Sequence, residues 1–339
     1  MEGEPAWLDR FSRQIALGPL GEDGQRRLCE STVTVVGAGA LGSNSAELLV
    51  RMGFGTVRIV DRDVVETSNL HRFRVLGKSH VGQSKAHALA EELNALVDGA
   101  RVEALPEDLT AGNALGLLEG SNVVVDGLDN METRYIVNDA CLEMGIPWVY
   151  GGVVGTVGME APFPAAGPCL RCLFPEPPAP GALPTCDSVG IHPSAPAVVA
   201  AVQVGHATRF VLDGSVSTTL MTMDLWTDQC RTMDFARRQG CPACSGGSRE
   251  FLEAGTGDIA SSLCGQDAVQ INPNRSASVD MDAKEREWAK LGRVTRAGPV
   301  LALDLGDVRL QLFPSGRALV KGTAEVAVAK TLYARYVGH

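Results

Sequence analysis

Residues 33–85 contain four segments that indicate the fold: VTVVGAGALG (33–42), RIVDRD (58–63), SNLHR (68–72) and GQSK (82–85). The stretch opens with an apolar β-branched run that predicts a buried strand, and it continues after a glycine-rich turn as a predicted helix. Gly37, Gly39 and Gly42 permit a tight turn and a close approach of the backbone to a ligand. Because the helix N-terminus offers free N–H groups to an anion, the stretch predicts a nucleotide site.

An acidic residue follows the turn at the spacing of a dinucleotide fingerprint. A second predicted strand, residues 57–60, leads into Asp61, about 20 residues after the turn, where such fingerprints carry an acid for the ribose hydroxyls. Asp63 lies two positions further on. Up to this point, a nicotinamide or flavin site fits the residues as well as an ATP site does.

Amide and basic side chains after Asp61 favour ATP. Asn69, Arg72 and Lys85 supply an amide, a guanidinium and an ammonium shortly after the acid. A dehydrogenase needs little positive charge beyond the pyrophosphate of its cofactor, whereas a triphosphate with a departing pyrophosphate needs several fixed donors. We therefore predict that this stretch binds ATP.

The order of the predicted elements indicates the fold class. Helices are predicted at residues 84–96, 133–144 and 195–212, and strands at residues 101–105, 122–126 and 218–226. Such alternation predicts an α/β fold in which a Rossmann-like parallel sheet is covered by helices on both faces. We expect a main domain (1–252), a polar linker (253–282) and a small α+β module (283–339), which is marginal in isolation and should dock on the main domain or on a partner.

Composition excludes some classes of partner. The 339 residues carry a formal net charge of −10 with a pI near 5.2, which argues against a broad nucleic-acid footprint. No apolar run reaches the roughly 18 residues needed to span a bilayer, and the acidic start lacks the pattern of a signal peptide. We predict a cytoplasmic protein with no nucleic-acid and no membrane partner, whose nine cysteines are not a disulfide framework.

Two aspartates follow a predicted strand, where open α/β sheets bind ligands. Asp126 ends the strand at residues 122–126, and Asp129 stands just beyond it, next to Asn130. Either carboxylate is a candidate for linking Mg²⁺, and either is a candidate for the N-cap of the next helix. We predict the Mg²⁺ role for Asp129 and the capping role for Asp126.

Two C-x-x-C pairs, Cys169 with Cys172 and Cys241 with Cys244, give the strongest metal signal. Each pair presents two thiolates to one ion, and four thiolates close a tetrahedral zinc site. A redox pair is the competing interpretation, but neither pair lies between a strand and a helix near the nucleotide stretch. We predict structural Zn²⁺, because four sulfur ligands leave no open position for a substrate.

Two further side chains have no role that the residues alone assign. Arg13 lies three positions after Arg10, which is typical of a solvated basic face of a helix. Cys186 follows a proline-rich segment that predicts an exposed loop, and most single cysteines have no function there.

Together these motifs resemble the MoeB/ThiF/HesA family, whose members are homologues of the ubiquitin-activating enzyme. The resemblance covers roughly residues 7–250 and rests on Arg13-Gln14, the glycine turn, DRD (61–63), SNLHR, GQSK, DGLDN (126–130) and the two C-x-x-C pairs. It implies that the chain uses ATP and Mg²⁺ to adenylate the C-terminal glycine carboxylate of a ubiquitin-like sulfur-carrier protein with a diglycine C-terminus. Pyrophosphate is the other product.

The resemblance also implies roles for individual residues. Asp61 would contact the ribose, Asn69, Arg72 and Lys85 would contact the phosphates, and Asp129 would hold Mg²⁺. The full implied nucleotide site comprises Gly37, Gly39, Gly42, Asp61, Asp63, Asn69, Arg72, Lys85, Asp129 and Asn130.

Further implications concern partners and transfer. Arg13 would cross a homodimer interface to reach the ATP of the partner subunit, and Cys186 aligns with a cysteine that in some relatives links covalently to the carrier. No rhodanese-like signature follows these motifs, so we expect a separate sulfur donor. The pathways that fit are molybdopterin, thiamine and thiolated-tRNA synthesis. The alternatives from other classes are an NAD-dependent oxidoreductase and a non-catalytic scaffold subunit.

Overall fold

The structure is a computed structural model of the chain, and it describes residues 9–97, 99–178, 186–253, 260–262, 267–271 and 279–338. The chain divides into two compact units. The first unit comprises Met1–Asp63, Thr67–Gly77 and Lys85–Gly255, and the second comprises Val64–Glu66, Lys78–Ser84 and Thr256–His339. The second unit therefore includes two short segments from the first third of the chain.

Within the described residues, the first unit is built on an eight-stranded sheet. In spatial order its strands are β3 (Val102–Leu105), β2 (Thr56–Val60), β1 (Thr32–Val36), β4 (Val123–Asp126), β5 (Trp148–Val154), β6 (Val157–Phe163), β7 (Thr219–Asp224) and β8 (Gln229–Asp234). The strands from β3 to β5 are parallel, which confirms the predicted Rossmann-like α/β fold. The strands from β6 to β8 are antiparallel, which the alternation of predicted strands and helices does not indicate. Only Gly155 and Thr156 join β5 to β6, and such a connection is too short for a parallel crossover.

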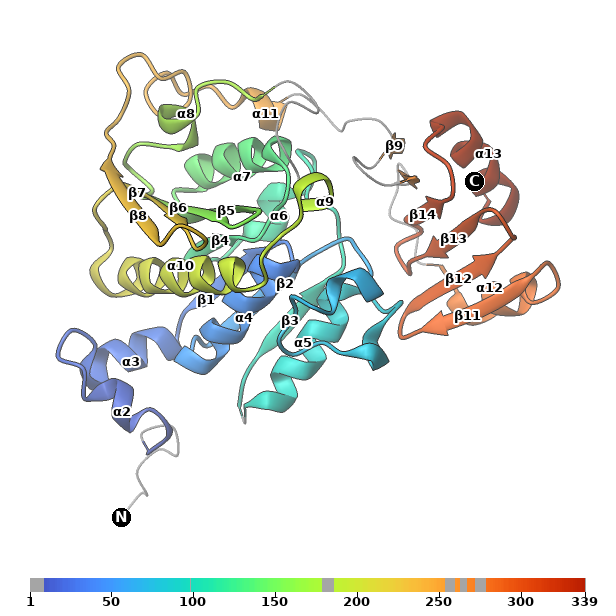
Figure 1. Cartoon of the computed structure of the whole chain (residues 1–339), viewed down its shortest axis with the longest axis horizontal. Coiled ribbons are helices and arrows are strands. Elements are labelled where there is room, and N and C mark those ends of the chain that lie inside the picture. The colour runs from blue at the N-terminus through green and yellow to red at the C-terminus, as the bar shows by residue number, and fades with distance from the viewer. Residues whose placement is uncertain are drawn as a thin grey trace. The chain divides into compact units, whose positions relative to one another are not determined.

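Helices cover both faces of this sheet (Figure 1). The helices of the unit are α2 (Ser12–Ile15), α3 (Gly21–Cys29), α4 (Ala40–Met52), η1 (Thr67–Asn69), α5 (Lys85–Leu96), α6 (Ala114–Leu118), α7 (Met131–Met144), α8 (Leu170–Leu173), α9 (Cys186–Val189), α10 (Ser194–Asp213) and α11 (Glu250–Glu253). α4, α5 and α10 lie on one face, and α6 and α7 lie on the other. β1 and β4 are covered on both faces, and their sequences, TVTVV and VVVD, are accordingly rich in valine.

In the described part of the chain, α10 is the one helix that is long and apolar enough to cross a membrane by length and composition alone. Half of its apolar window is buried inside the protein, and core helices of soluble proteins pass the same test. The buried amide of Gln203 donates to the main-chain oxygens of Asp126 at 2.8 Å and Val149 at 3.2 Å. These bonds tie the helix to the sheet, and we interpret α10 as a core helix of this unit.

The described part of the second unit contains a six-stranded antiparallel sheet. In spatial order its strands are β11 (Arg293–Ala297), β12 (Val300–Asp304), β13 (Arg309–Leu312), β14 (Ala318–Lys321), β10 (Ala268–Ile271) and β9 (Ala260–Ser262). Helices α12 (Met281–Trp288) and α13 (Val326–Tyr336) contribute to the apolar core on one face. β9 and β10 fall inside the range 253–282, where the sequence predicts a linker. β10 is buried because it pairs with β14, a partner that lies about 50 positions away and that local composition does not reveal.

Candidate nucleotide site and cysteine cluster

The glycine turn joins β1 to α4. Gly37 has a φ of +93°, and a Cβ there would lie 2.6 Å from the carbonyl carbon of Gly127. A Cβ on Gly42 would lie 1.8 Å from the carbonyl oxygen of Gly37, so both positions require glycine. At Gly39, the N-cap of α4, the nearest atom to an added Cβ is 3.9 Å away. The protein's own packing therefore explains Gly37 and Gly42 and leaves free space at Gly39.

Asp61 follows β2 and fixes the turn. Its carboxylate accepts hydrogen bonds from the backbone N–H groups of Ala38 at 2.6 Å and Asp63 at 2.7 Å. Burial raises the pKa of Asp61 above its ordinary value, and the charge of Lys85 opposes this rise. The predicted ribose ligand therefore lies directly beside the glycine turn.

Lys85 faces several carboxylates at the start of α5. Its ammonium lies 3.1 Å from a carboxylate oxygen of Asp63, and its side chain is only 13% exposed. Burial by itself would lower the pKa of Lys85, but the charges of Asp63, Asp61 and Asp129 outweigh burial and raise this pKa. A protonated amine therefore lies among carboxylates at the ends of the parallel strands.

The segment between Glu66 and Lys78 carries the other predicted phosphate ligands. Asn69 is 7% exposed at the end of η1. The guanidinium of Arg72 donates to the carbonyl oxygen of Ser68 at 2.6 Å, and its backbone N–H donates to the carbonyl oxygen of Asn69 at 3.1 Å. These hydrogen bonds within residues 68–72 thus hold Asn69 and Arg72 in one local turn.

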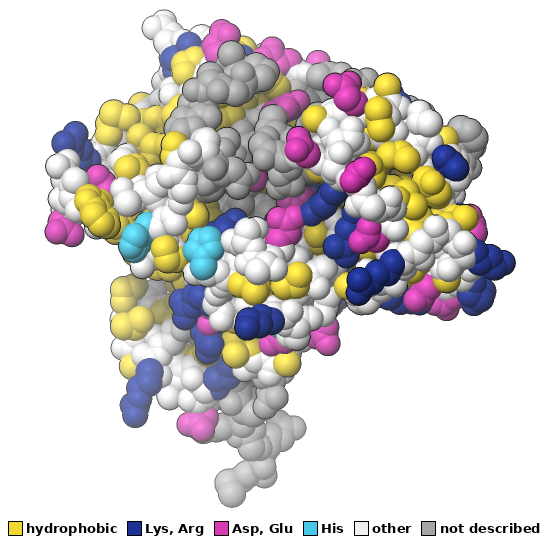
Figure 2. Space-filling model, turned by 45° about the vertical axis from the view of Figure 1, so that its right-hand side comes forward, with side chains coloured by type: hydrophobic (Ala, Val, Ile, Leu, Met, Phe, Trp, Pro, Cys, Tyr) yellow, Lys and Arg dark blue, Asp and Glu magenta, His cyan; other side chains and the backbone are white. Residues whose placement is uncertain are grey.

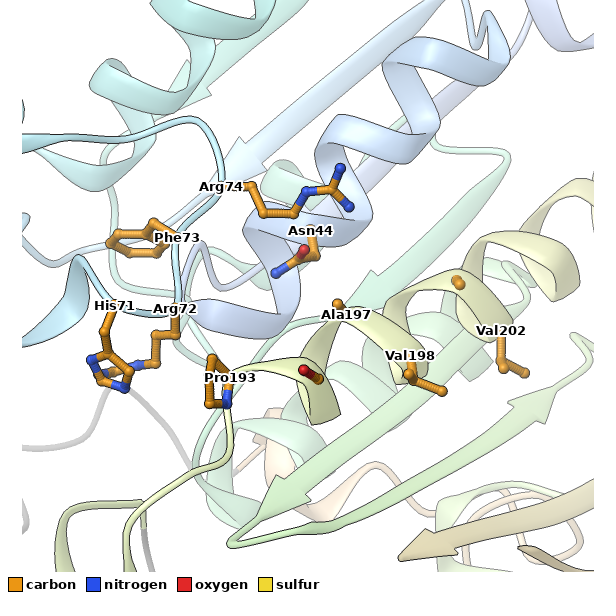
Figure 3. Close-up of a pocket in the computed structure, with 11 residues that line it drawn as sticks. Asn44, His71, Arg72, Phe73, Arg74, Pro193, Ala197, Val198 and Val202 are labelled. Atoms are coloured by element: carbon orange, nitrogen blue, oxygen red, sulfur yellow. The ribbon is translucent and has the colours of Figure 1, made fainter. Parts of the chain in front are cut away.

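A pocket of about 520 Å³ opens beside this stretch. His71 and Arg72 lie at one end of it, and Ala197 and Val198 of α10 form an apolar wall (Figure 3). Asn44 lines the pocket and is 1% exposed, and its side-chain oxygen has no hydrogen-bond partner among the described residues. The pocket therefore combines basic and polar groups with apolar helix surface.

The end of β4 carries a buried ion pair. Asp126 is 1% exposed, and its carboxylate accepts hydrogen bonds from Nε of Arg134 and from the N–H of Leu128, both at 2.8 Å. Burial raises the pKa of Asp126, and the charge of Arg134 opposes this rise. The N-cap of α7 is Asn130, whose side chain accepts from the N–H of Thr133 at 2.9 Å. The predicted capping role of Asp126 is therefore wrong.

Asp129 lies just beyond this pair and is exposed. One of its carboxylate oxygens accepts a hydrogen bond from the Asn130 side chain at 3.3 Å. Its charge acts on Arg62, Lys85 and Arg134, so these cations lie near it. The same cations also interact with other acids, so they do not neutralise Asp129 alone. An exposed carboxylate of this kind is chemically able to accept a hydrated metal ion.

Two buried side chains at this site are absent from the predicted set. Arg134 joins Asp126 to the carbonyl oxygens of Leu128 at 2.6 Å and Gly151 at 2.8 Å. Gln203, described above, holds α10 on the end of β4. A lone amide in an otherwise apolar helix is a usable signal for Gln203, whereas the pattern around Arg134 is that of any exposed helical arginine.

Two other predicted site residues are Arg13 and Cys186. Arg13 is exposed in α2, and among the described residues none forms a hydrogen bond or an ion pair with its side chain. The neighbouring Gln14 anchors the helix by donating to the carbonyl oxygen of Met52 at 2.7 Å. Cys186 begins α9, but its side chain lies outside the described residues.

The four predicted zinc ligands come together. The sulfur atoms of Cys169, Cys172, Cys241 and Cys244 all lie within 4.8 Å of one another. The separation is 3.4 Å for Cys172 and Cys244 and 3.7 Å for Cys169 and Cys241. Tetrahedral Zn–S bonds of about 2.3 Å require S···S separations of about 3.8 Å, so the cluster fits a zinc ion. The backbone N–H of Arg238 lies 3.3 Å from the sulfur of Cys172 and supports a thiolate there.

Sequence comparison places these groups in a known context. Residues 11–243 match the ThiF family. The sulfur carrier protein ThiS adenylyltransferase of Bacillus subtilis is 37% identical over 335 residues, which cover 97% of this chain and 99% of that protein. The sulfur carrier protein adenylyltransferase of Thermus thermophilus is 40% identical over 245 residues, which cover 70% of this chain and 90% of that protein.

Solved structures resemble the fold. A crystal structure of E. coli MccB with selenomethionine-labelled MccA gives a TM-score of 0.61 at 19% identity and covers 70% of this chain and 74% of the MccB chain. At this identity the likeness concerns the fold alone. The family match extends over more than half of the chain, and the similarity to the Bacillus protein extends over nearly all of it. The chain belongs to the ThiF family.

Proposed function

We propose that this chain is a nucleotidyltransferase that uses ATP to adenylate the C-terminal glycine carboxylate of a ubiquitin-like sulfur-carrier protein. Two relatives are named sulfur carrier protein adenylyltransferases, and one of them matches 97% of the chain. The observation that carries the proposal is the position of Lys85 among Asp61, Asp63 and Asp129 beside a glycine turn. A triphosphate needs such a fixed cation, and its metal ion needs a carboxylate, whereas a nicotinamide site needs neither.

The reaction requires charge stabilisation more than acid–base chemistry. A C-terminal carboxylate has a pKa near ~3.5 and is ionised at pH 7, so it needs no general base. Its approach to the α-phosphate brings two anions together, and negative charge then builds on the departing pyrophosphate. We propose that Asn69, Arg72 and Lys85 bind the phosphates and stabilise this charge. Asp61 then holds the ribose, and the space at Gly39 admits the nucleotide.

Asp129 is the residue that we propose for holding Mg²⁺. It is exposed at the end of a parallel strand, and Asn130 fixes the backbone beside it by capping α7. Bound Mg²⁺ would neutralise part of the phosphate charge. Asp63 contributes to the same site by orienting Lys85.

We propose that the protein acts as a homodimer in which Arg13 reaches the ATP of the partner subunit. The exposed part of α10 supports this proposal, because Val198 is 36% exposed and lines the pocket that also contains Arg72. Apolar side chains grouped on a surface are typical of protein interfaces. An arginine from a second copy would add positive charge where the phosphates carry negative charge.

We also propose features of the carrier protein, of the sulfur transfer and of the cellular location. We propose that the carrier ends in diglycine, because residues without side chains allow its backbone to approach the nucleotide closely. Cys186 would act only in a transfer after adenylation, with sulfur from a separate donor. The net charge of −10 argues against a nucleic-acid or membrane-surface partner, and we propose a cytoplasmic location. On the face shown in Figure 2, basic side chains are interspersed with acidic ones.

We also propose how the activity is distributed along the chain. Residues 1–252 would perform the adenylation, with the cysteine cluster as a structural zinc site. Residues 253–282 would connect this part to residues 283–339, and they also contribute β9 and β10 to the sheet of the second unit.

Carrier-dependent exchange between ATP and labelled pyrophosphate tests the proposal. Arg72→Ala and Lys85→Ala each remove one charge that stabilises the departing pyrophosphate, so each should lower the exchange rate about 10²-fold. Circular dichroism should show an intact fold in both variants. Arg101→Ala removes an exposed cation paired with Glu103 and should retain wild-type exchange. Unchanged exchange in Arg72→Ala and Lys85→Ala would contradict the phosphate assignment.

The same assay separates the proposal from the two other classes. An oxidoreductase would bind NAD tightly and would support no exchange with any carrier. A scaffold subunit would bind a carrier without exchange. A panel of carriers that end in diglycine, tested one by one, would identify the substrate.

A further inference from the structure

The second unit includes the residues on both sides of a segment that carries two of the proposed phosphate ligands. Val64–Glu66 and Lys78–Ser84 belong to this unit, and Thr67–Gly77 lies between them in sequence. Thr67–Gly77 contains Asn69 and Arg72. We call Thr67–Gly77 the phosphate segment, and we call the flanking residues Val64–Glu66 and Lys78–Ser84 its base. The base therefore belongs to the same compact unit as the C-terminal strands.

An apolar contact joins the base to the C-terminal sheet. Val64 forms a cluster with Val300, Phe313 and Leu319, and these four side chains are 4%, 1%, 1% and 2% exposed. The neighbouring Val320 belongs to the core beneath α12 and α13, so Leu319 points to the opposite face of the sheet. A side chain from early in the chain thus completes an apolar cluster on that second face.

An ion pair and a close approach add to this contact. The ammonium of Lys321 in β14 pairs with the carboxylate of Glu66, and the two side chains are 28% and 35% exposed. On the other side of the base, a Cβ added to Gly82 would lie 3.5 Å from Cβ of Ala297 in β11. Both halves of the base, Val64–Glu66 and Lys78–Ser84, are therefore in contact with C-terminal strands of the same unit.

The two ends are also bonded to each other. The backbone N–H of Val65 donates to the carbonyl oxygen of Gln83 at 2.8 Å. Next to this pair, the backbone N–H of Lys85 donates to the carbonyl oxygen of Asp63 at 2.9 Å. The two halves of the base are thus joined by backbone hydrogen bonds. The adjacent residues Lys85 and Asp63 also form a side-chain ion pair.

We propose that the C-terminal sheet positions the phosphate site by holding the base of the phosphate segment through Val64 and Glu66. This inference rests on the proposed function, because only that function makes Arg72 and Lys85 phosphate ligands. Fixing both ends of a segment removes conformations in which its ligands point away from the nucleotide. Lys321 is then a positioning residue, since it acts through Glu66 and does not contact ATP.

Hydrogen exchange of the full chain, without ATP or carrier, tests the contact directly. Lys321→Ala should raise the exchange rates of the backbone amides of Leu70 and Arg72 about 2–5-fold, which corresponds to the loss of one partly exposed ion pair. Val64→Ala removes buried methyl groups and should raise them about tenfold. Both amides are hydrogen-bonded within the segment, so their exchange reports its opening.

A matched control comes from the same unit. Arg296 pairs with Asp282 and Glu285, and neither partner belongs to the base of the phosphate segment. Arg296→Ala should therefore leave the exchange rates of Leu70 and Arg72 at the wild-type value.

Kinetics separate positioning from general stabilisation. Lys321→Ala should raise the KM for ATP about 2–5-fold with little change in kcat, because the competent arrangement is less populated in the free enzyme. The reversed pair, Glu66→Lys with Lys321→Glu, should bring KM back toward the wild-type value. A merely stabilising role would lower the melting temperature and leave KM unchanged.

The inference would be overturned by wild-type amide exchange in both Lys321→Ala and Val64→Ala, or by an equal rise in Arg296→Ala. Hydrogen exchange needs no substrate, so it remains decisive whatever reaction the chain catalyses. Absence of pyrophosphate exchange in the wild-type protein with every carrier would instead overturn the proposed function.

Discussion

At the scale of single residues, Asp126 and Arg134 depend on each other. Their side chains are 0% and 7% exposed, and removing one partner leaves the other charge buried. Such a loss typically costs about 3–5 kcal/mol. Arg134 keeps its bonds to two carbonyl oxygens, so we expect Asp126→Asn to lower the free energy of unfolding by about 3 kcal/mol. Urea denaturation at pH 7 measures this difference.

An exposed ion pair provides the control for this prediction. Glu22 and Arg26 pair on α3 with side chains 53% and 55% exposed, where water screens the interaction. Glu22→Gln should therefore change the free energy of unfolding by less than about 1 kcal/mol. If Asp126→Asn were no worse than Glu22→Gln, the buried pair would not be what holds the end of β4.

The sequence could predict site residues whose positions follow from spacing along the chain. Asp61 and Lys85 stand at fixed offsets from the glycine turn, and the structure brings them together, although their roles stay predictions. Asp126 received the wrong structural role because Asn130 caps α7, while the carboxylate of Asp126 pairs with the buried Arg134. Arg134 could not be predicted, because its burial depends on segments that meet only in the folded protein.

At the scale of elements, the cysteine cluster ties α8 to the segment after β8. Metal binding to such a cluster contributes directly to folding. We expect Cys172→Ser and Cys244→Ser each to lower the zinc content measured by elemental analysis. Each should also lower the melting temperature by on the order of 10 °C.

Cys230→Ser is the matched control for the cysteine cluster. Cys230 is exposed in β8 and does not belong to the cluster, so zinc content and melting temperature should not change. Pyrophosphate exchange below the melting temperature should persist in Cys172→Ser, because four sulfur ligands leave the ion no catalytic position. Loss of exchange in a folded Cys172→Ser protein would argue against a structural zinc site.

Elements could be predicted where the pattern is local. The parallel strands β1 to β4 are short runs followed by helices, and their predicted ranges agree with the structure to within about one residue. The parallel strand β5 is not among the predicted strands. β6 and β10 are different, because Gly158 and Glu160 interrupt the apolar run of the first and β14 is the distant partner of the second. Their pairing is set by tertiary contacts that no short window of sequence contains.

At the scale of the whole molecule, a mixing experiment tests whether Arg13 acts on a partner subunit. Arg13→Ala and Arg72→Ala should each be nearly inactive alone. In a mixed dimer, one site carries both changes and the other carries none. Random exchange of subunits should therefore restore about a quarter of the wild-type pyrophosphate exchange, since about half of the dimers are mixed.

A second mixture makes this result interpretable. Arg72→Ala and Lys85→Ala alter the same site from the same chain, so their mixed dimers contain no intact site and should not recover activity. No recovery in the mixture of Arg13→Ala with Arg72→Ala would place the action of Arg13 within its own chain.

The contact between Glu66 and Lys321 joins residues 255 positions apart, and this separation has a consequence for synthesis. A ribosome that adds about 5–20 residues per second makes Lys321 on the order of 10–50 s after Glu66. During that interval the nucleotide stretch has already emerged, but the strands that hold its phosphate segment do not yet exist. If the C-terminal sheet positions the phosphate site as proposed, a nascent chain binds ATP more weakly until Lys321 has been made, and full affinity is reached only when translation is almost finished.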